Sequence, residues 1–404
     1  MKVAIKTSLN IFLSRASGQM GVVLIFCILG YISGKEIGDL NVFLSFFAIF
    51  SSIASVSMVY FQNCIAESES QIIGLLFNKG WQLASLLGFF LSAIAMLLAF
   101  FTFNDTRFFY PIILACLVFP LLGVMAFLTF YLESIGEYHI PARIYLVVNL
   151  VQPLIFALIF QSDVGVLFSV SITFIVIDVV VFSLLGFFCR ASFVFNKVAI
   201  NCNDIVEMVK KGGSLSVGVA VQKYAFSLII IAVGSFGVFS ANVYAVLTSL
   251  IFMLMLPMVG IAHAGSIFIS KGARFDFKDC LWLALFYFLF ILILIYFFLP
   301  SSLKFLYNFS LNYNEVYLVR IPVLLFWFSQ VFMIFSISIA RAFYIIKFPQ
   351  IIACSSLFAG LFFGKRYSVN VYDFMSSISF FILAGSLLIF ALILFKKNFL
   401  IVKS

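Results

Sequence analysis

Two charged side chains lie deep inside apolar stretches of the sequence. Lys223 stands near the middle of residues 212–234, and Asp178 stands inside residues 165–188. Each stretch is about long enough to cross a bilayer as one helix, which takes roughly 20 residues. A charged group at mid-bilayer costs on the order of 3 kcal/mol even on lenient scales, so it normally faces a polar cavity or a partner. We therefore expect chemistry within a membrane at these two positions.

Lys223 shares one helical stripe with small and polar residues, namely Ser216, Ala220, Ser227 and Gly234. The other faces of this predicted helix carry Val, Ile, Leu and Phe. The stripe indicates that the helix forms the wall of a polar cleft. An ammonium in that cleft attracts an anion such as a pyrophosphate and repels a cation. The alternatives are that Lys223 snorkels or loses its proton in an apolar site.

Asp178 admits several interpretations. It could belong to a structural ion pair, or be a protonated carboxyl bonded to a neighbouring helix. It could be the counter-charge of Lys223, or it could carry a coupling proton. We assign Asp178 an ion-coupling role as a hypothesis, with the structural role as its alternative.

Uncharged amides and one arginine complete the candidate solute-binding residues. They are Gln222, Asn149 and Gln152 inside predicted spans, Gln62 and Asn63 at the end of the second span, and Arg15 near the start of the first. Amides inside spans also join helices through hydrogen bonds, and an arginine near a span end can simply anchor the helix at the headgroups. Both interpretations stay open for these residues.

The sequence lacks the motifs of other chemistries. There is no GxxxxGK[ST] phosphate loop, no HExxH, no Cys/His cluster and no nucleophile paired with a base. The seven Cys are scattered singly and suit apolar packing. We therefore expect no enzyme activity, no cofactor, no metal site, and no nucleotide or nucleic-acid partner. Transport would draw on H⁺, on Na⁺ or on the solute's own gradient.

Composition places the chain in a membrane. It has 404 residues, of which 65% are hydrophobic and 10% are charged, and Phe alone contributes 56. Lipid tolerates only helices and closed barrels, and the apolar runs are too long for barrel strands. The fold class is therefore predicted to be an all-α polytopic membrane protein.

The apolar runs predict about twelve spans, near 9–32, 41–65, 81–103, 109–131, 142–160, 165–188, 212–234, 241–267, 280–300, 318–340, 349–363 and 374–395. Most of the 24 Lys and Arg residues fall in the loops of one side, which predicts that both termini are cytoplasmic. The longest loop on that side divides the chain into an N-lobe (1–190), a cytoplasmic linker (191–211) and a C-lobe (212–404). Short sequence similarities between the two halves favour a parallel repeat of six helices with a solute path between them.

Short motifs in both halves resemble one transporter superfamily. In the first half these are LGYISGKEIGDLNVFLSFFAIFSS and FQNCIAESES, and in the second KKGGSLSVGV and LPMVGIAHAGSIFISKGARFD. They resemble the multidrug/oligosaccharidyl-lipid/polysaccharide (MOP) superfamily, and within it the O-antigen flippases, where an amide pair and a nearby Glu close the second span. Here those positions are Gln62, Asn63 and Glu67. The multidrug and toxic compound extrusion (MATE) exporters are the close second resemblance.

Departures from the MATE pattern help to choose between these branches. MATE exporters couple to Na⁺ or H⁺ through carboxylates within the spans. The matching positions here are Ile25 in the first span, Gln152 or Pro153 in the fifth, and Gln222 in the seventh. None of these positions holds an acid, and a cation, Lys223, lies beside the position of Gln222.

The sequence therefore predicts a bacterial inner-membrane flippase for a lipid-linked oligosaccharide of the O-antigen type. In this reading the partners are that amphiphilic solute and the membrane lipids. The alternative is a MATE-type exporter, coupled to Na⁺ or H⁺, of a drug, toxin or small peptide.

Overall fold

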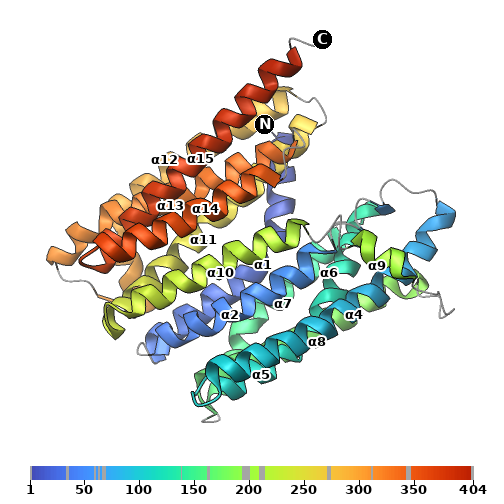
Figure 1. Cartoon of the computed structure of the whole chain (residues 1–404), viewed down its shortest axis with the longest axis horizontal. Helices are drawn as coiled ribbons and strands as arrows, with labels where there is room; N and C mark the ends of the chain where they lie inside the picture. Colours follow the sequence, from blue (N-terminus) through green and yellow to red (C-terminus); the bar gives the residue numbers. More distant parts are fainter. Residues whose placement is uncertain are drawn as a thin grey trace. The chain divides into compact units, whose positions relative to one another are not determined.

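The structure is a computed structural model and describes residues 2–32, 36–58, 61, 64–65, 70–137, 139–161, 164–192, 201–208, 214–270, 274–310, 313–342 and 347–401 (Figure 1). Its helices are α1 (Lys2–Ile32), α2 (Ile37–Val56), α4 (Ser70–Phe103), α5 (Phe109–Cys116), α6 (Phe119–Ser134), α7 (His139–Phe160), α8 (Val166–Cys189), α9 (Cys202–Met208), α10 (Ser214–Gly234), α11 (Val238–Ser270), α12 (Arg274–Tyr307), α13 (Tyr313–Ala342), α14 (Lys347–Tyr367) and α15 (Val371–Ile401). A short 3₁₀ turn, η2 (Arg190–Ser192), follows α8.

The predicted all-α membrane fold is confirmed. Among the described residues, 10 helices are long and apolar enough to cross a membrane, or 11 when the bent pair α5 and α6 counts as one span. The first predicted span corresponds to α1, in which the apolar segment Met20–Ile32 is shorter. Each predicted span thus has a helix in the structure.

The fourth predicted span is broken, and Pro120 explains the break. Helices α5 and α6 meet at an angle of 41° within the single span predicted for residues 109–131. Pro120 lacks the N–H that would bond the carbonyl of Cys116 one turn earlier. The hydroxyl of Ser92 on α4 donates to that carbonyl at 2.6 Å instead. A neighbouring side chain therefore satisfies the backbone group that the proline leaves free.

The contacts divide the chain into two compact units. One contains Val42–Tyr224, and the other contains Met1–Asn41 together with Ala225–Ser404. The second grouping arises because α1 packs along α11 and α12. It differs from the boundaries expected from sequence, which kept residues 1–190 together, so the two lobes of six spans stay a prediction.

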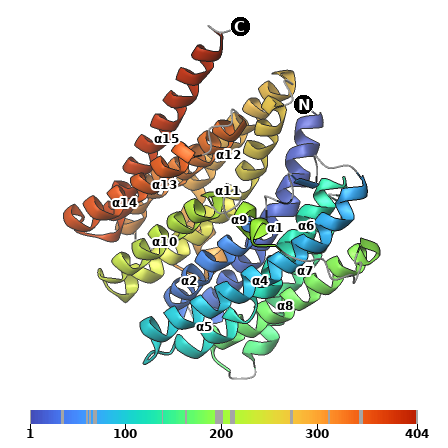
Figure 2. The ribbon, with the colours of Figure 1, turned by 45° about the vertical axis from the view of Figure 1, so that its right-hand side comes forward.

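The unit Val42–Tyr224 is built around close packing of α4, α6 and α8, with α5 and α7 against α8 (Figure 2). Rings from α2 join this core. Phe47 stacks on Phe119 with centroids 5.2 Å apart and lies 5.1 Å from Phe174 of α8. Phe174 is thus buried among rings in the interior of the unit.

In the other unit, α11 packs against α1, α12 and α13, and α15 packs against α13 and α14 (Figures 1 and 2). Pro257 lies inside α11 and removes a backbone donor at that turn. The carbonyl of Leu254, one turn earlier, accepts hydrogen bonds from the Tyr287 hydroxyl at 2.9 Å and the Trp327 indole at 3.4 Å. The carbonyl that Pro257 leaves without its helical donor is that of Met253, so these side chains of α12 and α13 bond the neighbouring carbonyl at the same turn.

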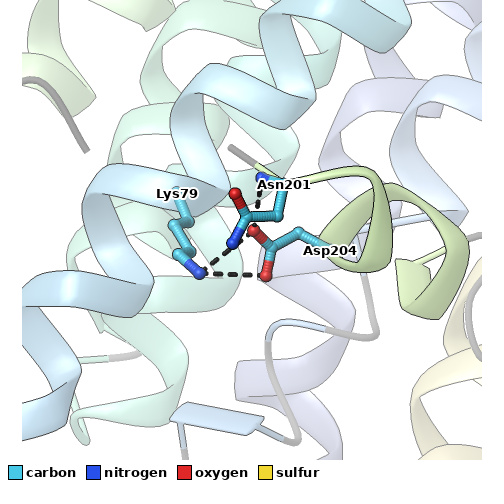
Figure 3. Close-up of polar contacts among 3 residues, drawn as sticks. All are labelled: Lys79, Asn201 and Asp204. Atoms are coloured by element: carbon cyan, nitrogen blue, oxygen red, sulfur yellow. Dashed lines mark hydrogen bonds and ion pairs between the residues drawn. The ribbon is translucent and has the colours of Figure 1, made fainter. Parts of the chain in front are cut away.

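The short linker helix α9 belongs to the unit Val42–Tyr224 and is joined to α4 by an ion pair (Figure 3). Both carboxylate oxygens of Asp204 accept from the Lys79 ammonium of α4, at 2.9 and 3.0 Å, and Met208 is buried in the core of the unit. The backbone N–H of Asn201 and the Lys79 ammonium hold the pKa of Asp204 below its usual value. This contribution to stability is present above the pKa of the free carboxyl and is lost as the pH falls through the lowered value.

The crossing of α4 and α6 depends on small residues, which gives a stability test. A Cβ added at Gly88 would lie 2.6 Å from the Phe119 carbonyl oxygen, whereas a Cβ at Gly74 of the same helix has nothing within 4 Å. Overpacking of this kind costs about 1–3 kcal/mol. We expect Gly88→Ala to lower the thermal unfolding temperature in detergent and Gly74→Ala to leave it nearly unchanged. Equal unfolding temperatures for the two variants would contradict the close packing.

Candidate functional site

Asp178 lies on the interior face of α8. Its neighbours on that face, Phe174, Ile177 and Val181, are buried, while Val179 is exposed. Phe174 is one turn away, so the two side chains lie one above the other. Asp178 forms no ion pair or hydrogen bond with another described residue. The structure therefore gives no support to the interpretation that Asp178 is the counter-charge of Lys223.

A tyrosine and a threonine form a polar pair between α6 and α7. The Tyr145 hydroxyl of α7 lies 3.1 Å from the Thr129 hydroxyl of α6, and Thr129 donates to the Met125 carbonyl at 2.8 Å. Two helices of one unit thus bring their hydroxyl groups within hydrogen-bond distance.

Two amides of α7 lie at a proline turn inside the same unit. Asn149 and Gln152 are buried, with exposed fractions of 6% and 3%, and the side-chain nitrogen of Asn149 has no hydrogen-bond partner among the described residues. Pro153 has no N–H for the Asn149 carbonyl four residues earlier. Asn149 and Asp178 each lie roughly 17 Å along their helices from the loop that joins them, at a rise of 1.5 Å per residue. Asn149 and Asp178 therefore lie at about the same distance from that loop on two helices, α7 and α8, that pack together.

Lys223 lies on a half-buried flank of α10. The most exposed face of this helix carries Val217, Tyr224 and Ile231, whose exposed fractions are 60%, 51% and 63%. Ser216 and Ala220, which share the stripe of Lys223, are buried. The ammonium therefore does not stand on the most exposed face, and Gln222 is half-buried beside it.

The remaining predicted residues fall outside what the structure describes. Gln62, Asn63 and Glu67 lie outside the described residues, as does the side chain of Arg15, although Arg15 is within α1. In the part of the chain that the structure does describe, no group of three or more His, Cys, Asp or Glu side chains is placed to hold a metal ion.

Sequence reasoning missed Tyr145 and Thr129. An isolated tyrosine in an apolar stretch suits core packing and gives no signal by itself. The available signal was spacing, because Tyr145, Asn149 and Gln152 follow one another at four and three residues and so share one face of α7.

The chain has the fold of transporters of the MOP superfamily, so the predicted resemblance is confirmed at the level of fold. An inward-facing multidrug resistance MATE family transporter matches with a TM-score of 0.78 at 10% identity, over 96% of this chain and 96% of that chain. The outward-facing conformation of a multidrug resistance MATE family transporter matches with a TM-score of 0.76 at 10% identity, over 98% of this chain and 95% of that chain.

A third similar structure is a MOP superfamily transporter from Pyrococcus furiosus, with a TM-score of 0.76 at 10% identity over 98% of this chain and 96% of that chain. It is described as having a binding pocket of reverse polarity that suggests a different function. No protein-family model and no curated protein sequence matches the chain.

The unpartnered amide of Asn149 yields a prediction. Replacing a buried donor that lacks a partner by an apolar group of similar size removes a desolvation cost of about 1–3 kcal/mol. We expect Asn149→Leu to keep or raise the unfolding temperature of the protein in detergent. Ser171→Ala is the contrast, because Ser171 donates within 2.9 Å of the Pro111 and Leu167 carbonyls and its loss should lower that temperature. A marked loss of stability in Asn149→Leu would show that the amide is satisfied.

Proposed function

We propose that this chain is a membrane transporter that moves an anionic amphiphile, and specifically a flippase for a lipid-linked oligosaccharide. In this proposal a polar cleft admits the sugar chain and its pyrophosphate, while the lipid tail stays in the bilayer. Two lobes, of residues 1–190 and 212–404, open the cleft alternately to either side.

The observation that carries this proposal is the ammonium of Lys223 within an apolar span of 19 residues, Ser216–Gly234, away from the most exposed face of the helix. A cation is costly at this depth unless an anion or water accompanies it. A pyrophosphate supplies several acceptor oxygens for such a group. The resemblance to MATE exporters places Ile25, Gln152 or Pro153, and Gln222 where those exporters carry acids. On this basis the site suits a negative solute better than a positive one.

Two further points support an anionic solute. The similar Pyrococcus furiosus transporter is described as having a pocket of reverse polarity. In this chain Lys223 lies beside Gln222, the residue at one of the positions where MATE exporters carry an acid. The amides Asn149 and Gln152 can bind sugar hydroxyls, and the unpartnered nitrogen of Asn149 offers a donor.

We assign Asp178 the coupling role, with H⁺ as the ion. A carboxyl that is enclosed in the bundle and has no ion pair among the described residues is more easily protonated than one that is paired. The orientation that we propose is that of a bacterial cytoplasmic membrane with both termini in the cytoplasm, because Lys and Arg gather in the loops of that side.

A MATE-type exporter of a drug, toxin or small peptide is the second candidate. The observation in its favour is the match to multidrug resistance MATE family transporters over nearly the full length of both chains. This candidate predicts that Lys223 is dispensable and that transport depends on Na⁺ or H⁺.

Substitution of Lys223 tests the proposed function. In a host strain that lacks the native protein, Lys223→Ala should reduce surface glycan at least about tenfold, since a contact of 1.4 kcal/mol or more is lost. Lys223→Arg keeps the charge and should restore part of it. The measurements are surface glycan and lipid-linked repeat units left on the cytoplasmic leaflet, at equal protein level.

Lys304→Ala is the matched control, because Lys304 is an exposed lysine near the end of α12. It should leave the glycan unchanged. Normal glycan in the Lys223→Ala strain would exclude the anionic cleft and favour the exporter.

Asp178→Asn tests the coupling role. Asparagine has nearly the shape of a protonated carboxyl and cannot release a proton, so the transport rate should fall and lose its dependence on pH. Asp204→Asn removes an acid from the linker helix and should retain the pH profile of the native protein. A native pH profile in Asp178→Asn would remove the coupling assignment.

A further inference from the structure

Two tyrosine rings hold an arginine inside a span of the second unit. Arg320 belongs to the apolar span Glu315–Ala340 of α13 and lies roughly 8 Å from its start, at a rise of 1.5 Å per residue. The carbon at the centre of its guanidinium lies 5.4 Å from the centre of the Tyr296 ring of α12 and 5.7 Å from that of Tyr317 on α13. Contacts of this kind attract the cation to the ring faces. Two helices that pack against each other therefore position this guanidinium.

The described part of the chain supplies no anion for Arg320. Its Nε is enclosed and has no hydrogen-bond partner there, and the side chain forms no ion pair with a described residue. Glu315, the acid in the first turn of α13, has its interactions with other groups. Arginine keeps its charge in proteins, and a charge within an apolar span is costly when no counter-charge accompanies it. The half-buried guanidinium therefore suits an anion that comes from outside the chain.

Exposed apolar side chains lead from the two rings toward the middle of both helices. On α12, Ile293 lies one turn before Tyr296 and is exposed like it. On α13, Tyr317, Ile321 and Leu325 follow one another at four residues and form an exposed ridge. In a helix that crosses a membrane, such ridges contact acyl chains. A molecule with a negative head and apolar tails matches both parts of this surface.

We propose that Arg320, held between Tyr296 and Tyr317, binds the phosphate of an anionic phospholipid whose acyl chains lie along the exposed ridges of α12 and α13. A guanidinium presents parallel N–H donors that match two oxygens of one phosphate. A zwitterionic phospholipid carries its own cation, which competes with the arginine for that phosphate. The site is separate from the proposed solute cleft and does not depend on it.

A second arginine of the same unit shows how a purely anchoring arginine differs. Anchoring arginines extend the charged end of the side chain into water. Arg366 fits this description, because it is exposed in the last turn of α14 and lies 5.7 Å over the ring of the next residue, Tyr367. Arg320 is instead half-buried and contacts rings from two helices. Arg366 is therefore the matched control.

The test is the binding of phosphatidylglycerol to the purified full-length protein in a non-ionic detergent, measured by native mass spectrometry. In Arg320→Gln the dissociation constant of the most tightly bound phosphatidylglycerol should rise about tenfold or more, because charge-assisted hydrogen bonds are lost. Arg366→Gln removes the same charge from an exposed position and should change that constant by less than about twofold. Phosphatidylcholine should bind the native protein more weakly than phosphatidylglycerol does.

Two further variants guard against a folding defect in Arg320→Gln. Tyr296→Leu keeps the charge and removes one ring, so the affinity should fall about two- to fivefold. Arg320→Lys keeps the charge without the planar donor pair and should retain part of the affinity. The thermal unfolding temperature of each variant without added lipid checks that the fold is intact.

Each outcome supports or overturns the lipid site. Native affinity for phosphatidylglycerol in both Arg320→Gln and Tyr296→Leu would overturn it. Displacement of the lipid by an equal concentration of inorganic phosphate would assign the site to a free anion and overturn the lipid. Equal affinities of the native protein for phosphatidylglycerol and phosphatidylcholine would overturn the preference for an anionic headgroup. Weaker binding in Arg320→Gln and Tyr296→Leu, but not in Arg366→Gln, would establish the site.

Discussion

Hydrocarbon offers no hydrogen bonds, so every polar group within the spans must be satisfied by the protein itself. At Pro120 the structure meets this constraint through a neighbouring helix, because Ser92 donates to the carbonyl that this proline frees on α5. Tyr287 and Trp327 donate to the Leu254 carbonyl near Pro257. The side-chain nitrogen of Asn149 is among the buried polar atoms that find no partner in the described part of the chain.

Hydropathy predicted the spans well, because crossing a bilayer demands long apolar runs whatever the tertiary contacts are. Hydropathy alone does not show the break between α5 and α6, which lies at Pro120. The size of a bend depends on which neighbour takes over the free carbonyl, and Ser92 lies on another helix. The packing of α1 on α11 and α12 could not be predicted from sequence either, since no local pattern specifies which helix another helix packs against.

The candidate site was predictable where a residue is unusual for its surroundings. Asp178 and Lys223 stand out in apolar stretches from sequence alone, and Asn149 and Gln152 stand out as amides. Tyr145 and Thr129 do not, because both are ordinary in helical spans and their hydroxyls come within hydrogen-bond distance only when α6 and α7 pack together.

The double acceptance by the Leu254 carbonyl has a mechanical consequence for α11. Because one donor comes from α12 and the other from α13, a change in the backbone of α11 near Pro257 would break contacts with two helices at once. Gly260, about a turn further on, lies against the backbone of Ser8 in α1. The backbone of α11 around Pro257 is thereby constrained by three other helices.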